Sequence, residues 1–215
     1  MRHLTVALYM TISVSQVKSN TDNTNFYVYK ELTPFAKSEL MKFHADFHKL
    51  NRSARFNRHF RASAEEVARL PFLSCNPFKD QIVKLFSDRD SMVSFDDFLD
   101  MMIVMHPKTK RHIKLAYLFA IYDFDGDGVL NHADLMHVIH RITGGTLSQS
   151  DREQAASKVL EELDFDDTHR ITLEEFEYFS TKCPDFEKLF STTQNTAHSW
   201  TLTLSHDYNY YWLNF

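Results

Sequence analysis

The chain has 215 residues, of which 43% are hydrophobic, and a net charge of −5. This length and apolar content suffice for one domain or two small lobes, and the modest negative charge argues against nucleic-acid binding through a basic face. Only 4 glycines and 5 prolines, with helical apolar spacing almost throughout, predict an all-α protein. Its two cysteines, Cys75 and Cys183, form no disulfide framework, so we expect a reducing, cytoplasmic setting.

Residues 1–30 differ in pattern from the rest and are expected to be a variable leader. A short apolar run from Leu4 to Val14 follows Arg2, so a weak signal peptide is the alternative interpretation. The run is too short to span a bilayer. Arg2 stands where N-myristoylation requires glycine, and we therefore expect no direct lipid anchor.

Residues 31–106 are expected to form an N-terminal lobe with two degenerate EF-hands. Apolar spacing predicts an amphipathic helix from Phe35 to Leu50, and a capping box of Ser63 and Glu66 starts a second helix that ends at Leu70-Pro71. The segment between them is basic and has no series of carboxylates. We therefore expect a first hand that has lost its metal.

The second hand is expected to keep its helices but not its ion. Asn76 and Pro77 have the pattern of an N-cap and a first-turn proline, and Val93–Phe98 matches the end of an EF-hand loop. Counting back places Phe86 at position 1, where a phenyl ring cannot ligate. The next helix is predicted from Phe95 to Met105.

Residues 123–134 have the spacing of an EF-hand calcium loop, with Gly128 at position 6 for the left-handed turn. A solvated acidic turn is the alternative, but four neighbouring carboxylates repel one another and the loop lies between two apolar periodic segments. The expected metal ligands are Asp123, Asp125, Asp127, the Val129 carbonyl and Asp134.

Asp134 changes the expected ion preference of this loop. Position 12 of a calcium loop usually holds a glutamate that ligates with both oxygens, whereas Asp134 is one methylene shorter. Fewer ligands and a tighter shell favour magnesium, which prefers octahedral oxygen ligands at about 2.0–2.1 Å. We therefore hypothesise a mixed Mg²⁺/Ca²⁺ site.

A fourth loop, residues 164–175, follows a glycine stop at 144–145 and a helix capped by Ser148. With the third loop it makes residues 107–190 a C-terminal lobe with two metal-binding hands. His169 replaces the usual glycine, so we expect weaker binding, with a collapsed structural hand as the alternative. The expected ligands are Asp164, Asp166, the Thr168 hydroxyl, the Arg170 carbonyl and Glu175.

Several motifs together resemble the calcium- and integrin-binding family over about residues 28–190. They are N-P-F-K at 76–79, S-F-D-D-F-L-D at 94–100, Y-D-F-D-G-D-G before an aspartate at position 12, and C-P-D-F-x-x-x-F at 183–190. The resemblance implies a non-enzymatic sensor and adaptor, expected to be a monomer. Its apolar groove would hold an amphipathic helix of a target such as an integrin α-subunit tail, a kinase or a channel. The missing myristoylation start and the replacements in the fourth loop depart from the family pattern.

Two other functions remain open from the residues. A calcineurin-B-like regulatory subunit of an enzyme would have four active hands, and a passive calcium buffer would barely open on binding its ion. Catalysis itself is not expected, because the chain has no P-loop, no nucleophile elbow and no His-Glu-x-x-His motif.

Three further patterns have an ordinary interpretation beside a functional one. The pairs His44/His48 and His137/His140 share helical faces as zinc ligands do, but no third ligand is near, and solvated helix surface is favoured. The methionines at 101, 102 and 105 suit an adaptable groove or, more often, a core. The aromatic tail, residues 191–215, is expected to be a disordered extension, with a lid over the groove as the alternative.

Overall fold

The computed structural model describes residues 26–50, 60–182, 192–194 and 200–202. The expectations for residues 1–25 of the leader, for residues 51–59 of the basic segment and for the rest of the tail lie outside these residues. Residues 26–30, expected to belong to the leader, instead lie in a helix of the fold, where Tyr29 is buried in the core. Within them the chain is mostly helical, which confirms the all-α prediction, and no helix is long and apolar enough to cross a membrane.

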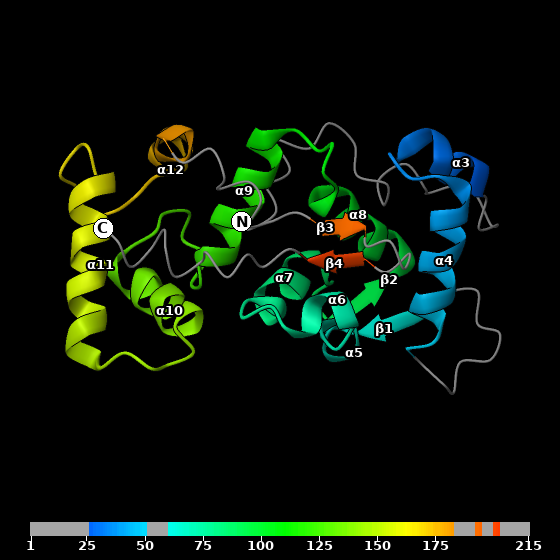
Figure 1. Ribbon diagram of the computed structural model, residues 1–215, viewed down its shortest axis with the longest axis horizontal. Helices are drawn as coiled ribbons and strands as arrows, with labels where there is room; N and C mark the ends of the chain where they lie inside the picture. The colour runs from blue at the N-terminus through cyan, green and yellow to red at the C-terminus, as the bar shows by residue number, and fades with distance from the viewer. Residues whose placement is uncertain (1–25, 51–59, 183–191, 195–199, 203–215) are drawn as a thin grey trace.

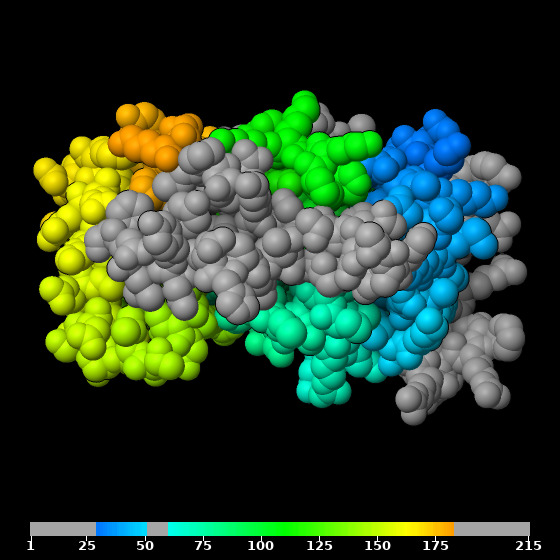
Figure 2. All heavy atoms as spheres, in the orientation of Figure 1, coloured from blue at the N-terminus to red at the C-terminus, as the bar shows by residue number. Residues whose placement is uncertain are grey.

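Figure 1 shows the order and arrangement of the described helices. The N-terminal lobe contains α3 (Phe26–Leu32), α4 (Lys37–His48), α5 (Ala64–Ala68), α6 (Pro71–Ser74), α7 (Lys79–Phe86) and α8 (Phe95–Met105). The C-terminal lobe contains α9 (Arg111–Tyr122), α10 (His132–Ile142), α11 (Gln149–Leu163) and α12 (Leu173–Lys182). In the space-filling view, the first helices and the last two lie at opposite ends of the molecule (Figure 2).

Short antiparallel contacts join the EF-hand loops in pairs. Strand β1 (Arg61–Ser63) pairs with β2 (Met92–Ser94), with Ala62 opposite Val93. In the C-terminal lobe a single bridge joins Leu130 to Ile171. Each of these pairings is made by position 8 of two loops, so the four hands are arranged as two pairs.

Side-chain caps begin two helices of the N-terminal lobe, and the sequence predicted the one at Ser63. The Ser63 hydroxyl accepts a hydrogen bond from the Glu66 N–H at 3.2 Å, and the Ser94 hydroxyl accepts one from Asp97. The expected cap at Asn76 lies earlier than the helix it was assigned to. Its Oδ1 accepts from the Phe78 N–H at 2.8 Å, while α7 begins only at Lys79.

Aromatic and sulfur-containing side chains fill the core. Phe86 stacks on Tyr117 of α9 with ring centroids 5.1 Å apart, and Phe78 packs against Tyr122 at the same distance. These contacts bring the two lobes together along α9. The favoured interpretation of the methionines is confirmed, since all three are buried, namely Met101, Met102 and Met105.

Part of the tail is described. Strand β3 (Thr192–Gln194) pairs antiparallel with β4 (Trp200–Leu202), and β4 packs against α6 of the N-terminal lobe. The two strands lie across the middle of the molecule in Figure 1.

Candidate metal centre

The third loop is organised around its first residue. Asp123 ends α9, and its Oδ1 accepts hydrogen bonds from the Gly126 N–H at 2.5 Å and the Asp127 N–H at 3.2 Å. Its Oδ2 accepts from Gly128 at 3.0 Å. Gly128 has φ of 92°, so the glycine predicted for the left-handed turn is needed there.

Asp134 closes the loop at the first turn of α10. The residue is only 2% exposed. One carboxylate oxygen accepts from the Phe124 N–H at 2.9 Å and the other from the Asn131 N–H at 3.1 Å. Carboxylate oxygens of Asp134, Asp123 and Asp125 lie within 4.8 Å of one another, close enough to ligate one ion.

The charges of this cluster favour a cation. Burial raises the pKa of Asp123, and the carboxylates of Asp134 and Asp127 raise it further. Burial likewise raises the pKa of Asp134, with Asp125 and Asp127 adding to the rise. A divalent cation bound among these oxygens offsets the repulsion between the carboxylates, and calcium and magnesium both prefer oxygen ligands. The residues present therefore suit such an ion.

Two of the predicted ligands of the third loop, Asp125 and Asp127, are exposed to solvent. The Asp127 Oδ1 accepts from the Val129 N–H at 3.0 Å, and Asp127 is outside the 4.8 Å group of carboxylates. The Asn131 side-chain amide donates to Asp125 at 3.4 Å. These bonds hold positions 3, 5, 7 and 9 in one turn.

The fourth loop repeats the closing pattern of the third. Glu175 accepts at one oxygen from the Phe165 N–H, at 2.9 Å, and at the other from the Thr172 N–H, at 2.8 Å. Carboxylate oxygens of Glu175, Asp164 and Asp166 lie within 4.8 Å of one another. This second cluster is assembled from the predicted positions 1, 3 and 12.

The start of the fourth loop differs in strain and in electrostatics. His169 has φ of 59°, so it takes the left-handed conformation expected of it, and Asp167 does the same at 54°. Burial alone would raise the pKa of Asp164, but N–H donors of Thr168 and His169 outweigh it and lower the pKa. The Thr168 hydroxyl lies 3.5 Å from the Arg170 carbonyl oxygen, which places both predicted ligands on the same turn.

Comparison with known proteins places this geometry in a family. The family described as an EF-hand domain pair matches residues 113–181, which include both loops. A relative from Drosophila melanogaster, calcium and integrin-binding family member 2, is 36% identical over 170 residues, covering 75% of this chain and 90% of the relative. The chain belongs to the calcium and integrin-binding family. Member 2 from Ovis aries is 33% identical over 77% of this chain and 97% of its own length, and member 3 from Mus musculus is 37% identical over 59% and 79%.

In this calcium and integrin-binding family protein, position 1 of the second loop belongs to the core. The Phe86 ring is buried and stacks on Tyr117, with the ring planes 4° apart. A side chain committed to this stack supplies no oxygen to the loop. As expected of the second hand, helices α7 and α8 lie on either side of the loop, and its position 1 offers no ligand.

The first histidine pair has a different role from the solvated surface that the sequence favoured. His44 is half-buried and packs edge-on against Phe95 with centroids 5.0 Å apart, and His48 packs against Phe60 at 5.1 Å. The two imidazoles therefore belong to the aromatic packing of α4. The spacing of the histidines carries no signal for this, because it depends on which helix lies opposite.

Sequence reasoning also missed Arg61. It belongs to a segment interpreted only as basic, yet its guanidinium reaches the second loop and bonds to Asp88 and Asp90. The only signal along the chain is the pair of carboxylates at positions 3 and 5 of a loop that has no ligand at position 1.

Proposed function

We propose that this protein is a Ca²⁺/Mg²⁺ sensor and adaptor that binds an amphipathic helix of a target protein in an apolar groove. The observation that carries the proposal is the pair of carboxylate clusters on two joined loops. Leu130 and Ile171 exchange backbone hydrogen bonds of 2.8 and 2.9 Å, so the two loops form one unit. The names of its relatives specify calcium and integrin binding.

The ligand positions couple the ion to the helices. Asp123 and Asp164 end the incoming helices α9 and α11, whereas Asp134 and Glu175 stand in the first turns of the outgoing helices α10 and α12. An ion shared by the first and last positions of a loop therefore fixes the angle between two helices. In sensor EF-hands, ion binding changes the angle between these two helices and exposes an apolar groove.

Recognition of the partner is then helix-in-groove, with apolar side chains of the target helix one turn apart as anchors. An integrin α-subunit cytoplasmic tail suits the family name, and a kinase or channel helix has the same chemistry. We propose a cytoplasmic monomer that reaches the membrane through its partner.

The two loops are proposed to differ in ion preference. Asp134 makes the third loop a mixed Mg²⁺/Ca²⁺ site, and the strained turn at His169 weakens the fourth loop relative to a loop with glycine there. The sensor would then hold magnesium in the third loop at resting calcium and exchange it on a calcium rise.

Calorimetric titration with calcium, with and without millimolar magnesium, tests the proposal while an apolar dye reports exposed surface. We expect two calcium sites, one of them weakened by magnesium, and a rise in dye fluorescence. A synthetic integrin α-tail helix should then bind in calcium and not in chelator, and a scrambled peptide of the same composition should not bind. Two sites with neither dye response nor peptide binding would indicate a buffer, and no calcium binding would refute both loop assignments.

A further inference from the structure

The second loop keeps the path of a metal-binding loop although its first position is phenylalanine. Ser91, at position 6, has a positive φ of 60°. Gly128 and His169, at position 6 of the third and fourth loops, also have a positive φ. Asp97, at position 12, accepts from the Ser94 N–H at 2.8 Å, as Asp134 does from Asn131. The carboxylates of a loop with this shape lie close together and repel one another, so a nearby cation stabilises the loop.

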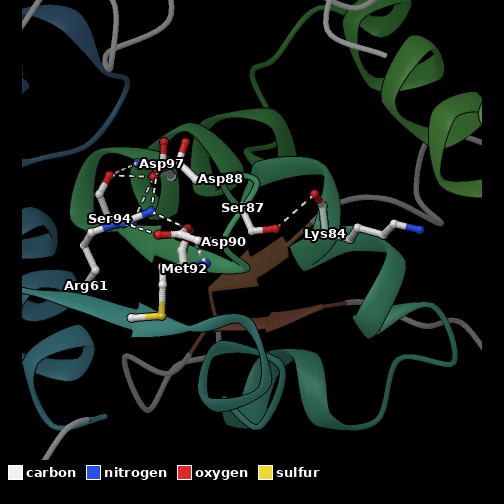
Figure 3. Close-up of polar contacts among 8 residues, drawn as sticks. All are labelled: Arg61, Lys84, Ser87, Asp88, Asp90, Met92, Ser94 and Asp97. Atoms are coloured by element: carbon white, nitrogen blue, oxygen red, sulfur yellow. Dashed lines mark hydrogen bonds and ion pairs between the residues drawn. The ribbon is translucent and has the colours of Figure 1, made fainter. Parts of the chain in front are cut away.

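The guanidinium of Arg61 points from β1 toward the carboxylates of Asp88 and Asp90 of this loop (Figure 3). Its Nη2 donates to Asp88 Oδ2 at 2.5 Å and to Asp90 Oδ1 at 2.9 Å, and its Nη1 donates to Asp90 Oδ2 at 2.7 Å. Nη2 also lies 3.3 Å from the Met92 carbonyl oxygen. Asp88, Asp90 and Met92 are positions 3, 5 and 7, three of the positions that hold the ion in a metal-binding loop.

Loop pairing brings Arg61 to this place. In the β1–β2 register Arg61 is opposite Ser94 and Ala62 is opposite Val93, so Arg61 is position 7 of the first hand. Its side chain crosses to the partner loop and is 32% exposed, while the Asp88 and Asp90 side chains are 64% and 55% exposed. Hydrogen bonding to Asp90 raises the pKa of Arg61 and lowers that of Asp90, so both groups stay charged.

An ordinary surface ion pair on the same lobe has a different geometry. Arg69, the residue that follows α5, bonds to Glu65 of α5 at 2.5 Å, and both side chains are largely exposed. Such pairs contribute little to stability because solvent screens them. Arg61 instead bonds to two carboxylates and a backbone carbonyl of another hand, 27 to 31 residues away in the chain.

We propose that the second hand has a built-in cation, the Arg61 guanidinium, which holds its loop in the ion-loaded shape and excludes a divalent ion. The N-terminal lobe then keeps one conformation at every calcium concentration. The response to calcium is confined to the C-terminal lobe.

The test compares Arg61→Ala with the matched control Arg69→Ala in the full chain. We expect the melting temperature to fall by about 2–4 °C for Arg61→Ala, because its bidentate pairing spans two hands, and by about 1 °C or less for the control. In ¹⁵N-serine-labelled protein, the amides of Ser91 and Ser94 should not move with calcium in the wild type. In Arg61→Ala they should shift at high calcium or magnesium concentrations, because Asp88, Asp90 and the Met92 carbonyl are then free to bind an ion weakly although Phe86 supplies no ligand.

Removing the loop charges in the Arg61→Ala background separates charge neutralisation from packing and also covers a variant that fails to fold. The triple variant with Asp88→Asn and Asp90→Asn should recover at least half of the lost melting temperature, because it no longer needs a cation, and its serine amides should not respond to ions. Failure to recover would refute the proposal. A saturable shift of the Ser91 amide with calcium in the wild type would refute it as well, since it would mean that an ion displaces the guanidinium.

Discussion

Replacement of Asp134 by glutamate is the sharpest test of the ion preference of the third loop. Asp134 accepts backbone N–H groups at both oxygens, at 2.9 and 3.1 Å, and Glu175 does the same in the fourth loop at 2.9 and 2.8 Å. A glutamate at position 134 can therefore accept the same two kinds of backbone hydrogen bond that Glu175 accepts in the fourth loop. Its extra methylene moves the carboxylate toward the ion, so both oxygens can reach calcium.

The expected size of the effect follows from one added ligand oxygen. We expect Asp134→Glu to strengthen calcium binding at the third loop about tenfold, or by about 1.4 kcal/mol. Magnesium should bind more weakly, because it requires six oxygens at about 2.0–2.1 Å and a bidentate carboxylate distorts that octahedron. The ratio of calcium dissociation constants with and without magnesium should therefore fall toward one.

Calorimetry on the wild type, Asp134→Glu and the reciprocal Glu175→Asp measures this ratio site by site. The reciprocal variant should make the fourth loop more sensitive to magnesium, which controls for a general effect of changing position 12. An unchanged magnesium effect in Asp134→Glu, with the protein folded by circular dichroism, would show that residue 134 does not set the preference and would refute the reasoning.

Three further outcomes are expected. Phe176→Ala should cost about 3–5 kcal/mol in a denaturant titration, because the ring is fully buried, whereas Phe165→Ala, 52% exposed, should cost about 0.5 kcal/mol or less. His169→Gly should strengthen calcium binding at the fourth loop by about 1 kcal/mol in calorimetry, because glycine relieves the left-handed strain. As pH falls from neutral toward about 5, the third loop should lose calcium before the fourth in titrations followed by amide shifts. The raised pKa values of Asp123 and Asp134 let protons compete there first, whereas those of Asp164 and Glu175 are lowered.

The sequence predicted those features that depend on a dozen neighbouring residues. Positions 1, 3 and 12 of a loop are held together by the loop itself, so spacing was enough to predict that Asp123, Asp125 and Asp134 converge. The same holds for the box at Ser63 and for the predicted end of α8 at Met105, because both depend on residues within about one turn.

Features that depend on a distant partner were missed. Arg61 and Asp90 are 29 residues apart, and they meet only because the β1–β2 register sets them on adjacent loops. His44 was expected in solvent because nothing in its own helix shows that Phe95 lies opposite. The short α6 was not predicted either, since its four residues are too few to show a helical period.

The lobes meet through contacts that begin next to the third loop. Tyr122 immediately precedes Asp123, and its ring packs on Phe78 of the N-terminal lobe. Arg141 of α10 lies over the Phe124 ring, 5.3 Å from its centroid, and donates to the Pro77 carbonyl at 2.9 Å. Both flanking helices of the third hand therefore rest on the same segment of the N-terminal lobe. If Arg61 holds the N-terminal lobe in one shape, that lobe provides a fixed support for the third hand. A change in the angle between α9 and α10 must then displace the rest of the C-terminal lobe.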